Sequence, residues 1–194
     1  MCPLDWNLTN NFLTPINMSI LKEEQFKSES VKNIAKKMIL AARTAPKARG
    51  QDYISLALAD GKELQIIADK MIEIGKRKGQ HFFERDAGNV LQSEVLVMMG
   101  TSIQSLKLNC GMCGYKDCAE KDKHPDIPCV FNTGDLGIAM GSAVSIAMDH
   151  RIDNRILYSA GQAIMELELL GKETRIAYGV PLSALSKNIF FDRK

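Results

Sequence analysis

The stretch DLGIAMGSAVSIAMD, residues 135–149, decides the fold of this chain. Apolar and small side chains recur in it three and four residues apart, which predicts a tightly packed helix over Asp135–Asp149. Thr133 is the expected N-cap of this helix, because a threonine oxygen can accept a hydrogen bond from the first free amides. Close approach to another backbone is expected along the face formed by Ile138, Ala139, Ser142, Ala143, Ile146 and Ala147.

Further helices and strands are predicted on both sides of this helix. The spacing of apolar residues predicts helices over about Ser19–Ala42, from the Asp60-Gly61 turn to about Ile74, and over about Ala160–Leu170. Strands are expected at Tyr53–Leu58, Glu94–Met99 and Thr174–Val180, the last of them ended by Pro181. His81–Asp86 is interpreted as an interaction or loop-packing segment. This order predicts an α+β or α/β layout with few strands, in a single domain over residues 1–194.

Composition and charge exclude several classes of protein. The net charge is +2 and the basic residues are scattered, which argues against a nucleic-acid-binding surface. Apolar runs such as Val95–Met99 are far too short for a membrane helix, and Met1–Thr14 lacks the pattern of a signal peptide. The chain is therefore expected to be cytoplasmic, with no membrane partner and with reduced thiols. Hydrophobic residues make up 45% of the 194 residues, which is enough for a sizeable core.

Four of the five cysteines lie within residues 110–129. Their spacing is C-x2-C-x4-C-x10-C, and clustering of this kind in a reducing compartment points to a metal rather than to disulfides. The C-x2-C pair lets two thiolates meet one metal centre from a single tight turn, for which Gly111 and Gly114 supply a permissive backbone. The expected metal ligands are Cys110, Cys113, Cys118 and Cys129.

The identity of the metal stays open between an iron–sulfur cluster and zinc, and thiols without a metal are the third alternative. Zinc sites usually have two separated C-x2-C pairs or include histidines, whereas this loop has one pair, wider gaps and His124. Four cysteines fit [4Fe–4S] or [2Fe–2S], and the compact spacing of the first three favours the four-iron form. Cys2 lies far from the others and is interpreted as incidental.

The cysteine segment resembles a known family. Cys110–Cys118 is similar to the CGxCGYxxC segments of four-iron cluster domains. With Pro128–Phe131 (PCVF) and residues 135–142, it resembles a family of uncharacterised prokaryotic proteins described as containing a ferredoxin domain. This resemblance covers roughly residues 30 to 193 and implies no established activity. The loop itself is expected over residues 108–131, inserted between a buried strand and the helix that follows.

The rest of the chain resembles the nitroreductase family. Leu40–Pro46 (LAARTAP) followed by Gln51 is similar to the turn that runs along bound FMN in that family. Residues 135–147 are similar to its long central helix at the dimer interface, and Ala177–Pro181 (AYGVP) to its late strand. The resemblance implies an α+β fold with an antiparallel sheet between helices. It also implies a homodimer with FMN at the subunit interface.

Three basic residues crowd the loop that follows the first predicted helix. Such a loop can clamp a phosphate; alternatively, the basic residues only complement the dipole at the end of a helix. Together with the resemblance, this loop gives as candidate flavin contacts Arg43, Lys47, Arg49 and Gln51. The Arg-Ser-x-Arg element of the family is absent, and only Lys27–Ser30 (KSES) is found near the N-terminus.

Two functions of different classes follow from these features. The first is a redox protein, an FMN-dependent oxidoreductase with an iron–sulfur cluster, which would receive electrons from a donor protein. A cluster moves one electron at a time and a flavin accepts one or two, so the pair couples unlike donors and acceptors. The second is a non-enzymatic metal-binding module, with zinc or a cluster, on a cofactor-free nitroreductase-like fold. The missing arginine element favours the second function.

Overall fold

A four-stranded antiparallel sheet forms the centre of the computed structural model, which describes residues 20–191. The strand order is β1-β2-β4-β3. The strands are β1 (Ile54–Ala59), β2 (Val95–Thr101), β3 (Asp153–Asn154) and β4 (Ile176–Ser183). Every residue of β2 is buried, because β2 lies in the middle of the sheet and both of its faces are covered. The predicted antiparallel sheet between helices is confirmed.

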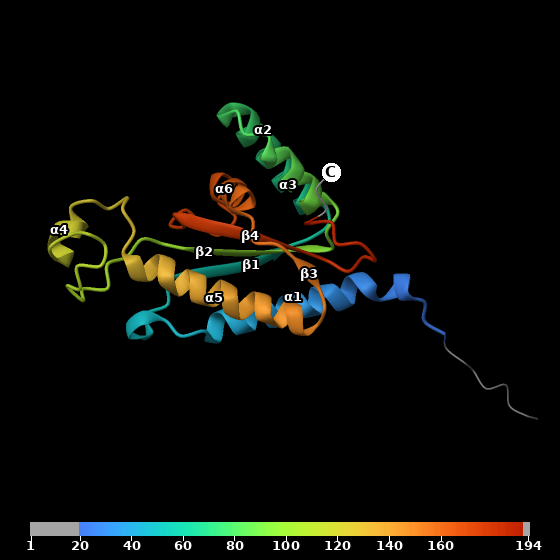
Figure 1. The fold of residues 1–194 in the computed structure, drawn as a ribbon, viewed down its shortest axis with the longest axis horizontal. Helices are drawn as coiled ribbons and strands as arrows, with labels where there is room; N and C mark the ends of the chain where they lie inside the picture. The colour runs from blue at the N-terminus through green and yellow to red at the C-terminus, as the bar shows by residue number, and fades with distance from the viewer. Residues whose placement is uncertain (1–19, 192–194) are drawn as a thin grey trace, which may run out of the picture.

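Helices cover both faces of this sheet (Figure 1). On one face lie α1 (Lys27–Thr44) and α5 (Val130–Asp149). On the other face lie α2 (Lys62–Lys78), α3 (Phe82–Leu91) and α6 (Tyr158–Glu166). Each layer has its own hydrophobic core cluster, and the sheet separates the two clusters. Among the described residues, no helix has both the length and the apolar character that crossing a bilayer requires.

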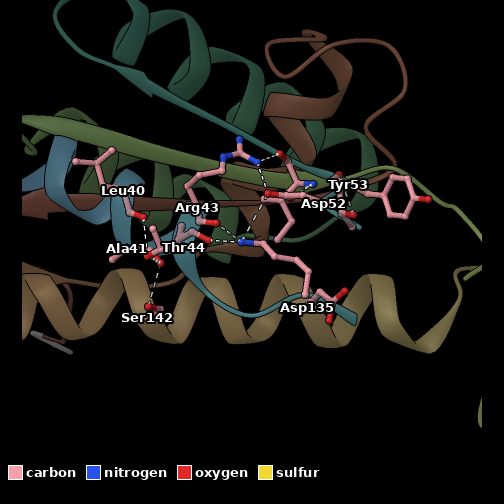
Figure 2. Close-up of polar contacts among 12 residues, drawn as sticks. Leu40, Ala41, Arg43, Thr44, Asp52, Tyr53, Asp135 and Ser142 are labelled. Atoms are coloured by element: carbon pink, nitrogen blue, oxygen red, sulfur yellow. Dashed lines mark hydrogen bonds and ion pairs between the residues drawn. The ribbon is translucent and has the colours of Figure 1, made fainter. Parts of the chain in front are cut away.

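The predicted close approach of α5 occurs against α1, but the prediction was wrong for Ile138, which is 50% exposed and lies outside the shared core cluster. The small residues Ala139, Ala143 and Ala147 of α5 are fully buried in the same cluster as Ala35 and Ala42 of α1. The Ser142 hydroxyl donates a hydrogen bond to the Ala41 carbonyl oxygen at 3.1 Å, which joins the two helices directly (Figure 2). The pair forms a rigid layer under the sheet, and the loops at its end carry the candidate site.

Two helix starts differ from the sequence prediction. The first long helix begins at Lys27 rather than near Ser19, since Ile20 and Leu21 are exposed and have no core to pack against. The helix predicted from Asp135 begins at Val130, and Cys129 occupies its N-cap position. The Thr133 hydroxyl donates to the Val130 carbonyl at 2.9 Å, so Thr133 lies inside the helix and its prediction as the N-cap was wrong.

Two further elements were misjudged. His81–Asp86, expected as a loop-packing segment, leads into α3, whose apolar residues Phe83, Ala87 and Val90 do have helical spacing. Pro181 does not end the last strand but lies within β4, opposite Leu96. It is accommodated there because β3 pairs with only the next two residues of β4.

A buried carboxylate joins α3 to α6. The Ser159 hydroxyl donates to Asp86 at 2.6 Å, and the Arg85 guanidinium donates to the other carboxylate oxygen at 2.7 and 3.0 Å. We expect Asp86→Ala to lower the free energy of unfolding by about 2 kcal/mol, because it leaves the buried Ser159 hydroxyl without its acceptor. Urea unfolding measures the loss. The control is Asp69→Ala, an exposed carboxylate, which should cost less than about 0.5 kcal/mol; equal losses would contradict the prediction.

Candidate functional site

The four cysteines lie in a projection at one end of the sheet, between β2 and α5 (Figure 1). Cys110 is exposed, whereas Cys113 and Cys118 are half-buried and Cys129 is buried. Cys118 begins the short helix α4 (Cys118–Asp122), and Cys129 is the N-cap of α5. The cysteine segment is therefore flanked by the central strand of the sheet on one side and the longest helix on the other.

The first two cysteines, Cys110 and Cys113, lie on a single tight turn of the backbone. Gly111 and Gly114 have φ of 70° and 87°, values that favour glycine, and the Gly114 amide donates to the Gly111 carbonyl at 3.0 Å. Lys107 and Asn109 also have positive φ, so the backbone is sharply folded directly before the turn. The two glycines therefore supply the left-handed backbone conformations that this turn requires.

The sulfur of Cys118 lies among hydrogen-bond donors. The Asn109 amide donates to Cys118 Sγ at 3.2 Å, and the Cys118 amide donates to Asn109 Oδ1 at 2.9 Å. The Ser105 hydroxyl, followed by the amides of Asn109 and Leu108, stabilises the thiolate and lowers the pKa of Cys118 below its ordinary value. Metals bind the thiolate and not the thiol, so the lowered pKa of Cys118 favours the form that can act as a ligand.

The thiols of this segment do not converge on one point. Within residues 20–191, no three side chains of His, Cys, Asp or Glu are grouped closely enough to hold a metal ion. The donor chemistry nevertheless fits a metal. Two thiols lie on a glycine-rich turn, one is a favoured thiolate, and Cys129 lies at a helix start where backbone amides favour negative charge.

The loop between α1 and β1 lies beside the start of α5, and its charged side chains have partners within the chain. Arg43 donates to Asp52 Oδ2 at 2.6 Å and to the Ile54 carbonyl at 3.1 Å (Figure 2). Burial alone would raise the pKa of Asp52, but the Ile54 amide and the Arg43 guanidinium outweigh it and hold the pKa below its usual value. Arg43 is thus committed to a local ion pair.

Arg43 lies in the last turn of α1, and the other three predicted flavin contacts lie in the loop that follows it. The Lys47 ammonium donates to the last carbonyls of α1, those of Ala42 and Arg43, at 2.7 and 2.6 Å. This is the helix-dipole arrangement that was the alternative reading of the basic residues. Gln51 accepts a hydrogen bond from the Tyr53 hydroxyl at 3.0 Å. The positive charges of Arg43 and Lys47 both lie close to Asp52 Oδ2, at 2.6 and 3.7 Å.

Arg49 connects this loop to the cysteine segment. It lies in the short 3-10 helix η2 (Ala48–Gly50) with a φ of 56°, and its guanidinium donates to the Leu106 carbonyl at 2.7 Å. Leu106 is buried and lies a few residues before the first cysteine. A second tie runs from the Gln104 amide to Asn132 Oδ1 at 3.0 Å, and Asn132 belongs to the first turn of α5. The base of the cysteine segment is therefore held by both neighbours.

A pocket of about 430 Å³ lies where the two loops meet. Its wall is mostly apolar and includes Met112, which lies between the first two cysteines. The one carboxylate on its wall, that of Asp135, is buried and accepts the Ala48 amide at 3.1 and 3.2 Å. The other lining residues come from the 46–48 loop and the first turns of α5: Pro46, Lys47, Val130, Phe131, Gly134 and Ile138.

Sequence reasoning missed three residues of this site: Asp135 and Met112, which line the pocket, and Ser105, which stabilises the thiolate of Cys118. Asp135 carried a detectable signal, since it is the only charged residue between Val130 and Met148. A lone charge in an apolar helix is expected to have a specific partner. Met112 and Ser105 carried no such signal, because their roles depend on how the loop folds back on its neighbours.

The outer face of α5 is apolar and uncovered. Ile138 and Met148 are 50% and 61% exposed. A Cβ atom added to Gly134, Gly137 or Gly141 would meet no atom within 4 Å. This face carries no charged side chain from Gly134 to Met148, since Asp135 is buried on the other side. A helix that is apolar all round is normally covered on every side.

Comparisons with known proteins identify relatives of both the segment and the fold. Residues 126–193 match the family described as "Uncharacterized protein containing a ferredoxin domain (DUF2148)". A protein from Archaeoglobus fulgidus, described as uncharacterized, is 39% identical over 184 residues, which are 90% of this chain and 97% of that protein. The matched family segment includes Cys129 and the whole of α5.

Solved structures with similar folds are flavoproteins and nitroreductases by their descriptions. A BluB-like flavoprotein from Clostridium difficile 630 has a TM-score of 0.53 and 18% identity, over 92% of this chain and 87% of that chain. A nitroreductase family protein from Clostridium novyi NT has a TM-score of 0.52 and 17% identity, over 81% and 78%. The predicted nitroreductase-like α+β fold is confirmed.

Proposed function

Because the chain belongs to the family of proteins described as containing a ferredoxin domain, we propose that it is a redox protein that holds an iron–sulfur cluster. The nitroreductase-like fold, shared with oxidoreductases, supports the same redox role. The proposed ligands are Cys110, Cys113, Cys118 and Cys129. The compact turn that carries the first two and the favoured thiolate of Cys118 support this assignment, and the spacing favours the four-iron form.

The observation that carries the redox proposal is the wall shared by the cysteine turn and the apolar pocket. Met112 belongs to both, and Cys129 directly precedes the pocket residue Val130. A flat aromatic ring system such as that of FMN suits a mostly apolar pocket of about 430 Å³. When bound, a flavin accepts one or two electrons and a cluster exchanges single electrons. We therefore propose an oxidoreductase in which the pocket binds FMN.

One set of contacts favours the second candidate, a metal-binding module that uses no flavin. The charges of Arg43 and Lys47 are directed to Asp52 and to the end of α1, so neither is free for a phosphate. The Asp135 carboxylate on the pocket wall would repel a phosphate. In this candidate the cysteine segment binds zinc or a cluster, and the fold is only its scaffold.

An anaerobic absorption spectrum with metal analysis separates these candidates. The redox proposal predicts broad visible absorbance that a reductant bleaches, about four iron atoms per chain for the four-iron form, and quenching of FMN fluorescence on titration. Iron and absorbance without FMN binding would support the scaffold candidate with a cluster. A colourless protein with one zinc per chain would overturn the redox proposal.

The tie between Arg49 and the cysteine segment gives a further prediction. In Arg49→Met the Leu106 carbonyl loses its guanidinium donor, and the base of the segment opens more often. We expect the visible absorbance to decay about fivefold faster in the presence of a chelator, which corresponds to one hydrogen bond of about 1 kcal/mol. The control is Arg77→Met on α2, whose guanidinium pairs with glutamates far from the segment. An unchanged decay rate in Arg49→Met would show that the tie does not restrain the segment.

We further propose that the chain forms a homodimer through the outer face of α5. The exposed apolar stripe with its open glycines supports this assembly. Exposure of Cys110 at the projecting end would leave the cluster accessible to an electron-donor protein. Because the proposed thiolate ligands must stay reduced, we propose that the protein acts in the cytoplasm.

A further inference from the structure

A buried lysine in the cysteine segment lacks a close partner for its charge. The Lys121 side chain, on α4, is only 4% exposed. Its ammonium donates no hydrogen bond to any residue of the described chain, and the nearest carboxylate oxygen, on Asp122, is 3.9 Å away. Lys121 Nζ is not among the fully buried polar atoms without a hydrogen bond in the described chain, so it keeps contact with solvent at this point, and an anion that enters can take the place of that water.

A pocket of about 230 Å³ lies directly beside this ammonium. It is distinct from the apolar pocket and shares no residue with it. Its wall is mainly polar and is formed by Gln104, Ser105, Lys107, Lys121, Asp122 and their neighbours. The volume suits a ligand of several non-hydrogen atoms, since one water occupies about 30 Å³.

The ionisable side chains that line this pocket, those of Lys107, Lys121 and Asp122, sum to one positive charge. Lys107 donates a hydrogen bond to Asp122, which lowers the pKa of Asp122 and pairs these two charges with each other. Lys121 is then the surplus cation. The side-chain amide of Gln104 donates no hydrogen bond within the described chain, so it is available as a second donor on the same wall.

From this arrangement we propose that the pocket binds a small oxyanion, a carboxylate or phosphate group, on the Lys121 ammonium and the Gln104 amide. An oxyanion satisfies both donors at once, because its oxygens accept several hydrogen bonds. The site lies close to Cys118, since the hydroxyl of the pocket residue Ser105 bonds to that sulfur. The cysteine segment therefore carries a small-anion site next to a proposed cluster ligand.

Thermal unfolding of the purified, unaltered chain tests this site. Inorganic phosphate and acetate are titrated separately against chloride at equal ionic strength. We expect a saturable rise of the midpoint of roughly 2–4 °C, which corresponds to about 1 kcal/mol of linked binding in a chain of this size. A response to phosphate alone would identify a phosphoryl ligand, and a response to acetate alone would identify a carboxylate. A midpoint that moves no more than in chloride would overturn the proposal.

Variants distinguish the pocket from general charge effects. Lys121→Met keeps the apolar stem but removes the buried charge, so its midpoint should lie higher without ligand and should not respond to either anion. Lys123→Met removes the same charge from an exposed position two residues away and should respond as the unaltered chain does. Gln104→Leu should weaken the response severalfold, which keeps the test valid if Lys121→Met does not fold. An equal response in all of these proteins would refute the site, and none of these readouts depends on the cluster.

Discussion

A Cys113→Ser protein is expected to lose the visible absorbance and nearly all of its bound iron. Cys113 is half-buried at the end of the Gly111–Gly114 turn, where its partner Cys110 is exposed. A serine here removes one of the four proposed thiolate ligands, and the three that remain, Cys110, Cys118 and Cys129, leave one metal position without a protein ligand. Absorbance and iron content of the anaerobically purified protein measure the effect.

The matched control is Cys2→Ser, which removes a cysteine outside the segment and should leave colour and iron unchanged. Cys2 lies outside the described residues. Folding of both variants is compared by circular dichroism, since the sheet and its two helical layers do not depend on the turn. Full retention of iron by Cys113→Ser would remove Cys113 from the ligand set, and loss of zinc instead of iron would replace the cluster by a zinc site.

The helices and strands that could be predicted are those whose buried residues follow a regular spacing in the sequence. Small residues at helical spacing predicted α5 and its close approach to another backbone, but not that this backbone is α1, and short apolar runs predicted β1 and β2. The helix α3 was missed although Phe83, Ala87 and Val90 have the right spacing, because the charged residues among them resembled a loop. Its formation depends on packing against α2 and α6, which no local pattern reports.

The candidate site was less predictable because its properties come from partners distant in the chain. The basic loop could be recognised, but whether Lys47 faces a phosphate or the end of α1 depends on a few torsion angles. The guanidinium of Arg49 binds a carbonyl 57 residues away, and Asp135 binds an amide 87 residues away. Charge patterns predict that a loop is basic, but only the tertiary fold determines which partners its charges meet.

The cysteine segment also depends on its surroundings for its own structure. It has one helix of five residues and no hydrophobic core cluster of its own. Its base is held by Arg49, and its final cysteine is fixed by the start of α5. Segments of this size cannot bury enough apolar surface to fold alone. Whatever the cysteines bind is therefore held in a fixed position relative to the apolar pocket and to the outer face of α5.

A Gly141→Glu substitution on the outer face of α5 is expected to convert the proposed dimer into monomers. Gly141 lies in the middle of the uncharged stripe, and a side chain added there points into open space within one subunit. In a twofold dimer the same face meets itself, so two glutamates would be buried close to each other without partners. We expect the dissociation constant to rise at least about 100-fold, equivalent to about 3 kcal/mol.

Folding of the subunit should not suffer, because glutamate is a better helix former than glycine by roughly 0.5–1 kcal/mol. Sedimentation velocity over a range of concentrations measures the assembly. The matched control is Gly88→Glu, the same change at a helical glycine of α3 that also has open space around it, and it should remain dimeric. A dimer that survives Gly141→Glu would move the interface away from α5. Because Gly134 and Ile138 belong both to this outer face and to the wall of the proposed FMN pocket, the monomeric variant should also lose FMN binding while it keeps its iron, which separates the pocket from the cysteine segment.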